Sequence, residues 1–195
     1  MSMRIEPNND WYWEYSRQRR KFLLHINGNN MLLTQYGLKD LGLDPDSDID
    51  TVSINVDDSS MFYVFIQCIL DLPYTRMEKI QIAINAITVL KFCKAETINY
   101  IDNARRFNLL ASRTPSQGEV LSVVPSFSNN DIGDVLVLKV CNGRSICMVL
   151  GTGLKDGDKS YNFLDVVTVD NECLYPVYKM NVDLNSELQL KSIAL

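Results

Sequence analysis

Residues 75–92 read TRMEKIQIAINAITVLKF, and this stretch decides the fold of the chain. Thr75 and Glu78 stand three positions apart and form the pattern of a capping box, in which two side chains satisfy free N–H groups at a helix start. When residues are placed at ~100° each, the polar side chains share one narrow stripe and nearly everything else is apolar. That stripe contains Glu78, Gln81, Asn85 and Thr88. The pattern predicts a central helix over 76–92 that is covered on two sides.

Upstream of this helix the sequence favours strands. Aromatic residues at 11–15 and apolar residues at 22–26 are typical of strands, and the Asn-Gly pair at 27–28 favours a turn after the second of these. Residues 52–56 alternate as a strand does.

A second apolar segment, residues 60–70, precedes the central helix. Its side chains are apolar in every direction, so periodicity does not separate a helix from a buried strand. We favour a helix, because Asp57 or Asp58 could cap it.

Downstream of the central helix the character of the chain changes. Apolar residues spaced three apart predict a further helix at 97–107, and Ser, Pro and Gly then gather near 112–118. Beyond them the chain is rich in strand-forming residues, and Asn142-Gly143 marks a two-residue hairpin turn. We expect an α+β fold with an N-terminal α/β domain at 1–112 around the central helix. A small, mostly antiparallel, barrel-like β domain follows at 118–195.

The charge of the chain is acidic overall but uneven. A net charge of −5 argues against nucleic acid as the partner, because phosphate backbones are bound by dense Lys and Arg. Residues 61–113 nevertheless hold seven Lys or Arg against four Asp or Glu. A basic patch is therefore to be sought in the middle third of the chain.

The cysteines and the hydropathy indicate a cytosolic protein. The five Cys include no C-x-x-C pair and stand among apolar neighbours, as reduced buried thiols do. The N-terminus lacks the apolar segment of a signal peptide, and no apolar run reaches the ~18 residues of a membrane span. We expect a cytoplasmic monomer that binds no membrane and holds no cofactor or metal.

Residues that would support catalysis are few. His25 is the one histidine, so a His-dependent catalytic or metal site would rest on it, and a place on a partly exposed strand explains it more simply. Residues 151–160 lack the spacing of a phosphate loop, and the four Asp between 44 and 50 lack the Gly and Glu of a calcium loop. We expect no enzyme. The alternative is an enzyme for a small molecule in an apolar pocket, with Asp165 or Asp57 as base.

Two groups of residues are candidates for binding. Lys91 and Lys94 stand one turn apart at the end of the central helix, beside its apolar arc, and Arg105 and Arg106 follow. The lysines form either an ordinary solvated helix end or a cationic rim around an apolar groove.

Trp11 and Trp13 share one face of the first strand, where they either pack in the core or line a pocket for an apolar side chain. Trp13 and Leu24 are the candidates for the apolar wall of a groove beside the two lysines.

Four segments together resemble the ZapC family of cell-division proteins. Residues 3–13 read MRIEPNNDWYW, residues 23–28 read LLHING, residues 56–58 read VDD, and residues 85–94 read NAITVLKFCK. The resemblance spans nearly the whole chain and is specific over residues 3–94.

The resemblance implies a cytoplasmic protein that binds FtsZ at the division site. It implies that the protein stabilises FtsZ polymers, promotes lateral association of protofilaments and lowers the GTPase rate of FtsZ. It also implies an α/β domain followed by a β domain.

Overall fold

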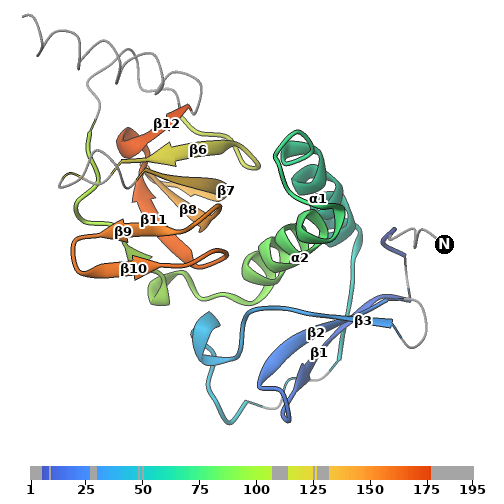
Figure 1. Cartoon of the computed structure of the whole chain (residues 1–195). Coiled ribbons are helices and arrows are strands. Elements are labelled where there is room, and N and C mark those ends of the chain that lie inside the picture. The colour runs from blue at the N-terminus through green and yellow to red at the C-terminus, as the bar shows by residue number, and fades with distance from the viewer. Residues whose placement is uncertain are drawn as a thin grey trace, which may run out of the picture. The chain divides into compact units, whose positions relative to one another are not determined.

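The computed structural model describes residues 6–8, 10–26, 30–47, 49, 51–106, 114–124, 126 and 132–176. The chain forms two compact units, Met1–Ile98 and Asn99–Leu195 (Figure 1). Two helices and several sheets confirm the predicted α+β class. The predicted domain ranges, 1–112 and 118–195, stay a prediction.

A four-stranded antiparallel sheet underlies the first unit, with the strand order β3-β2-β1-β4. The strands are β1 (Tyr12–Ser16), β2 (Lys21–Ile26), β3 (Asn30–Leu33) and β4 (Val52–Ser53). One face of this sheet turns its large side chains inward, and there Trp13 lies opposite Leu24. His25 lies on the other face, stacked on Tyr12 with ring centroids 4.4 Å apart. The expected turn at 27–28 lies outside the described residues.

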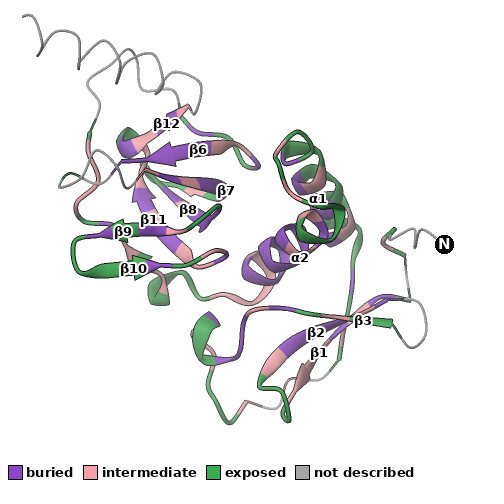
Figure 2. Cartoon of the chain, in the orientation of Figure 1, coloured by how far each residue is buried: buried purple, intermediate pink, exposed green. Residues whose placement is uncertain are grey.

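Two helices pack against the inward face of this sheet. α2 (Arg76–Phe92) begins and ends where the sequence predicts, and the Thr75–Glu78 capping box is present in both directions. Its residues from Ile82 to Val89 are all buried, and Figure 2 shows the helix buried along most of its length. This confirms a helix that is covered on more than one side.

The segment before α2 is also a helix, α1 (Val56–Cys68), which settles the ambiguity in favour of helix. Its N-cap is Asn55 and not Asp57 or Asp58, so the predicted cap was wrong by two or three positions. Asp58 is instead the third helical residue and accepts a hydrogen bond from the N–H of Asn55 at 3.0 Å. A capping box therefore starts both helices.

The second unit is built on a six-stranded sheet with the order β12-β6-β7-β8-β11-β5. Its strands are β5 (Asn99–Tyr100), β6 (Val120–Val123), β7 (Gly133–Cys141), β8 (Arg144–Val149), β11 (Val166–Asp170) and β12 (Leu174–Pro176). β9 (Leu154–Asp156) and β10 (Lys159–Tyr161) form a separate hairpin. Neighbouring strands run antiparallel except β5 and β11, and the sheet is open at β12 and β5 among the described strands.

The turn between β7 and β8 confirms the hairpin signal. Asn142 and Gly143 have φ values of 43° and 80°, and positive φ at both positions is what a type I′ turn requires. The β9–β10 hairpin spans residues 154–161, so most of the segment that lacks the spacing of a phosphate loop lies in two paired strands and their turn.

The helix predicted at 97–107 was wrong for the residues that the structure describes. A 3₁₀ turn at Ala95–Thr97 is followed by strand β5, which pairs in parallel with β11 through Asn99 opposite Val167. Ile101 then donates its N–H to Thr168 O at 3.0 Å and lies buried in the core of the second unit. The apolar residues spaced three apart here take part in strand pairing and core packing and not in a helix, because tertiary contacts outweigh local propensity.

Candidate functional site

The two lysines predicted at the basic end of α2 have different surroundings. Lys91 Nζ lies 2.6 Å from Asp58 Oδ2, and the two side chains are only 15% and 10% exposed. Because Asp58 also accepts the Asn55 N–H, one carboxylate joins the start of α1 to the end of α2. Lys91 is therefore engaged in an internal ion pair that holds the two helices together.

Lys94 lies beyond the end of α2 and is exposed. Its backbone N–H donates to Leu41 O at 2.9 Å, which fixes the chain after the helix. No ion pair of its side chain occurs within the described part of the chain. Of the two lysines, Lys94 is the one whose ammonium group is available to a partner.

Trp13 and Leu24 lie beneath this helix end, with exposed fractions of 1% and 0%. The Trp13 ring meets Phe92 edge-on with centroids 6.0 Å apart, and Phe22 stacks on the same Phe92 ring at 4.7 Å. The structure thus brings these two predicted residues together, but in the core. They support the end of α2 from below and offer no surface of their own.

Arg105 and Arg106 belong to the second unit, whereas Lys91 and Lys94 belong to the first. Arg105 is partly buried and donates its backbone N–H to Val124 O at 2.7 Å. Arg106 is 66% exposed and lies 3.4 Å from Asp170 and 3.8 Å from Glu172.

Asp170 is the centre of a charged network in the second unit. Its carboxylate accepts a hydrogen bond from Tyr100 Oη at 2.7 Å and pairs with Arg144 Nε at 3.1 Å. The Arg144 guanidinium also lies over the Tyr100 ring, 4.5 Å from its centroid. The Tyr100 hydrogen bond, assisted by Arg144 and Arg106, holds the pKa of Asp170 below its ordinary value. The network holds the guanidinium groups of Arg106 and Arg144 at the surface of the second unit.

A further basic surface lies in the first unit, on the turn between β1 and β2. Residues 17–21 read RQRRK, so four cations occur in five residues. This run of like charges is a signal in the sequence, but it lies outside the middle third of the chain, where the excess of Lys and Arg predicted a basic patch.

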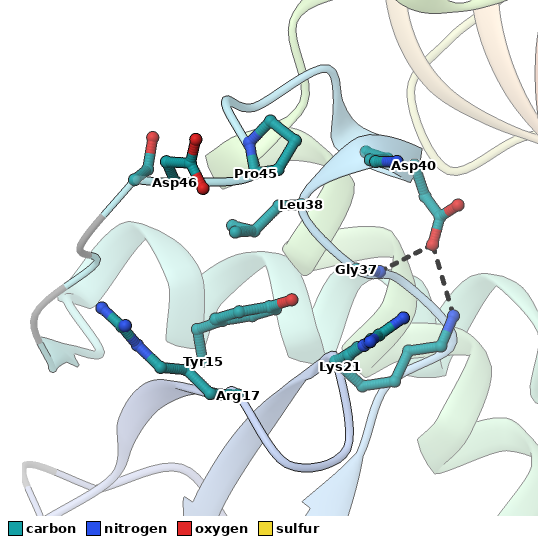
Figure 3. Close-up of a pocket in the computed structure, with 11 residues that line it drawn as sticks. Tyr15, Arg17, Lys21, Gly37, Leu38, Asp40, Pro45 and Asp46 are labelled. Carbon is teal, nitrogen blue, oxygen red and sulfur yellow. Dashed lines mark hydrogen bonds and ion pairs between the residues drawn. The ribbon is translucent and has the colours of Figure 1, made fainter.

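Beside this turn is a cavity of about 600 Å³ (Figure 3). One wall comes from the turn and the other from residues 37–47. Its lining comprises Tyr15, Arg17, Arg20, Lys21, Gly37, Leu38, Lys39, Asp40, Pro45, Asp46 and Ser47. Across it, Lys21 Nζ pairs with Asp40 Oδ2 at 3.3 Å.

The residues named as possible catalysts have ordinary structural roles. His25 Nε2 lies 2.6 Å from Glu14 on the outward face of the first sheet. Asp165 accepts the backbone N–H of Asn162 at 2.7 Å, as a turn residue does, and Asp57 is exposed in the first turn of α1. Among the described residues no group of three His, Cys, Asp or Glu side chains is arranged to hold a metal ion.

Comparison with known proteins finds similarity to a family of cell-division proteins. Residues 4–94 match the family model described as the N-terminal part of the cell-division protein ZapC. A protein of Tolumonas auensis named cell division protein ZapC is 28% identical over 175 residues, which cover 89% of this chain and 93% of that protein. A protein of the same name from Xenorhabdus bovienii is 22% identical over 175 residues, covering 89% and 92%. The chain is therefore similar to ZapC proteins along most of its length.

ZapC proteins are cell-division proteins and are not known as an enzyme family. The family model covers most of the first unit, including the basic turn, α1, α2 and both lysines, whereas the two relatives also extend over the second unit. In the described part of the chain, no helix has the length and apolar character to cross a membrane.

Proposed function

We propose that this protein is a cytoplasmic cell-division factor that binds FtsZ directly at midcell. It stabilises FtsZ polymers by promoting association of protofilaments and lowers the GTPase rate of FtsZ, without catalysing a reaction itself. The observation that carries the proposal is the likeness to ZapC proteins along 175 residues. We propose further that it acts as a monomer.

Electrostatics supports a local basic contact. FtsZ is acidic and this chain has a net charge of −5, so the two proteins repel at long range unless cations face the contact. The end of α2 supplies such a cation in Lys94, which is exposed.

The other predicted residues take distinct roles in this proposal. Lys91 positions the helix end through Asp58, and Trp13 and Leu24 support it from the core. Arg105 and Arg106 supply the basic contact of the second unit, where Arg106 is the more exposed of the two.

Co-sedimentation with purified FtsZ and GTP tests the proposal. We expect more FtsZ in the pellet and slower phosphate release when the protein is present. An unchanged pellet at protein concentrations well above micromolar would contradict direct bundling. GTP turnover by the protein alone would show that an active site has been overlooked.

A further inference from the structure

The cavity beside the β1–β2 turn combines charge with an apolar floor. The ring of Tyr15 forms the floor, with Leu38 and Pro45 facing it across the gap (Figure 3). The lining carries four cations and two carboxylates, which leaves an excess of two positive charges. They come from Arg17, Arg20, Lys21 and Lys39, and from Asp40 and Asp46.

The cations of the cavity are not equivalent. Lys21 pairs with Asp40 and also donates to the backbone O of Gln35, so it fixes the wall. Within the described residues, by contrast, the side chains of Arg20 and Lys39 have no polar partner. These two groups, one from each wall, are free to meet an anion.

The walls are held in place by the backbone. Arg20 adopts a φ of 53°, in the left-handed region, and a Cβ at Gly37 would come within 2.5 Å of Arg20 O. Asp40 accepts the Gly37 N–H at 2.7 Å, and Phe22 donates its N–H to Tyr36 O at 2.9 Å. The cavity is thus a formed site, and an exchange of Gly37 for a larger residue would open it.

These features fit one class of ligand. A phosphate monoester carries a charge of about −1.5 to −2, which matches the excess of two positive charges. Arg and Lys are the preferred phosphate-binding side chains, and a tyrosine ring stacks on planar groups. A volume of about 600 Å³ lies within the range of small-molecule sites.

The two carboxylates of the cavity favour a small phosphate ligand over an acidic peptide. Asp40 and Asp46 would repel the repeated negative charges of such a peptide, because like charges brought together disfavour a complex. The same carboxylates can accept hydrogen bonds from the hydroxyl or amino groups of a small polar molecule.

We propose that this cavity binds a small phosphate monoester that carries a planar ring, of the class of a nucleoside monophosphate. The site is separate from the FtsZ-binding function proposed above. Tyr15 stacks on the ring, Arg20 and Lys39 bind the phosphate, and Asp40 and Asp46 accept hydrogen bonds from polar groups of the ligand.

Isothermal titration calorimetry on the full chain tests this proposal. The probes are AMP, GMP, adenosine, inorganic phosphate and a hexaglutamate peptide. We expect a nucleoside monophosphate to bind with a dissociation constant below about 1 mM, and adenosine, phosphate and the peptide to bind at least about tenfold more weakly.

Variants assign the contacts. Arg20→Asn keeps a residue that tolerates positive φ, and Lys39→Gln keeps an exposed polar side chain. Each should weaken nucleotide binding by about tenfold or more, because a hydrogen bond to a charged group is lost. Tyr15→Phe should retain binding and Tyr15→Leu should lose it. The control is Lys159→Gln, an exposed lysine of the second unit.

Four results would overturn the proposal. One is no heat from either nucleotide up to about 1 mM. The second is preference for hexaglutamate, which would make the cavity a peptide site, and the third is equal affinity for inorganic phosphate and nucleotide, which would remove the ring from the interaction. The fourth is unchanged nucleotide binding by folded Lys39→Gln, which decides the matter even if Arg20→Asn fails to fold.

Discussion

The ion pair between Lys91 and Asp58 predicts a measurable loss of stability when its cation is removed. Lys91→Met keeps the length and the apolar part of the side chain but removes the charge 2.6 Å from Asp58 Oδ2. A hydrogen bond to a charged group contributes about 1.5–3 kcal/mol, and breaking a fully buried pair costs about 3–5 kcal/mol.

We expect the loss of stability in Lys91→Met to lie in the lower of these two ranges, about 1.5–3 kcal/mol. The side chains of Lys91 and Asp58 are 15% and 10% exposed, so water can partly solvate the carboxylate that remains. Asp58 also keeps the N–H of Asn55 at 3.0 Å. We expect Lys91→Met to lower the free energy of unfolding of the first unit by about 2 kcal/mol.

Urea unfolding followed by tryptophan fluorescence measures this loss. The chain has two Trp, and both Trp11 and Trp13 are buried in the first unit, so the signal reports that unit. Adding Asp58→Asn to Lys91→Met should cost less than the sum of the single changes, because no unpaired charge remains. The matched control is Lys94→Met, at an exposed position.

A loss below about 0.5 kcal/mol for Lys91→Met would refute the reasoning, because changes of that size are typical of surface positions. Strict additivity in the double variant would refute it as well, since it would show that the two side chains do not interact in solution.

Three further predictions rest on the same structure. Ile84 is completely buried in α2, so Ile84→Ala should lower the free energy of unfolding in urea by about 2–4 kcal/mol. Met77 is 51% exposed, so Met77→Ala should cost under about 0.5 kcal/mol. Equal losses for the two variants would contradict the burial of this side of the helix. Lys94→Glu should reduce FtsZ in the pellet at low salt and less so at high salt, with Lys159→Glu and circular dichroism as controls; bundling like wild type would place the contact elsewhere. The pKa of Asp170 is lowered in the folded state, so its contribution to stability is complete above the unfolded pKa near 4 and is lost as the pH falls through the folded pKa. Asp170→Asn should remove this part of the loss of stability in acid, measured by urea unfolding at stepwise lower pH. An unchanged dependence of stability on pH in the variant would contradict the prediction.

The central helix could be predicted to the residue because its signals are local. The Thr75–Glu78 capping box sets the start, and the wide apolar surface predicts the burial of residues 82–89, which includes Asn85 and Thr88 of the narrow polar stripe. The Asn142-Gly143 turn was predictable for the same reason, since positive φ is a property of the two residues themselves.

Strand β5 could not be predicted in this way. The spacing of Ile98 and Ile101 is that of a helix, and what decides the conformation is parallel pairing with β11, some 70 residues further along the chain. Periodicity within a window carries no information on such a partner. The cap of α1 was misplaced for a smaller reason, because Asn55, Asp57 and Asp58 are all acceptable caps and the choice depends on where the strand before them ends.

The candidate site shows the same limit for charged residues. Lys91 and Lys94 stand three positions apart at one helix end, and nothing in the sequence separates their roles. The fold separates them, because α1 brings Asp58 against Lys91 while Lys94 lies past the last turn. A sequence predicts where cations gather, but their availability to a partner depends on which carboxylates the fold brings to them.

Because Lys91 is paired with Asp58 and Lys94 is exposed, binding by the end of α2 is best tested by changing Lys94 alone. Reversing the charge at both lysines would place a second carboxylate beside Asp58, where Lys91 now supplies the compensating cation. Two like charges at that distance repel, so the double variant would loosen the contact between α1 and α2. A loss of FtsZ binding would then report the damaged helix pair as much as the missing contact. Lys94 is exposed and its side chain forms no ion pair within the described part of the chain, so the change at Lys94 alone separates binding from folding.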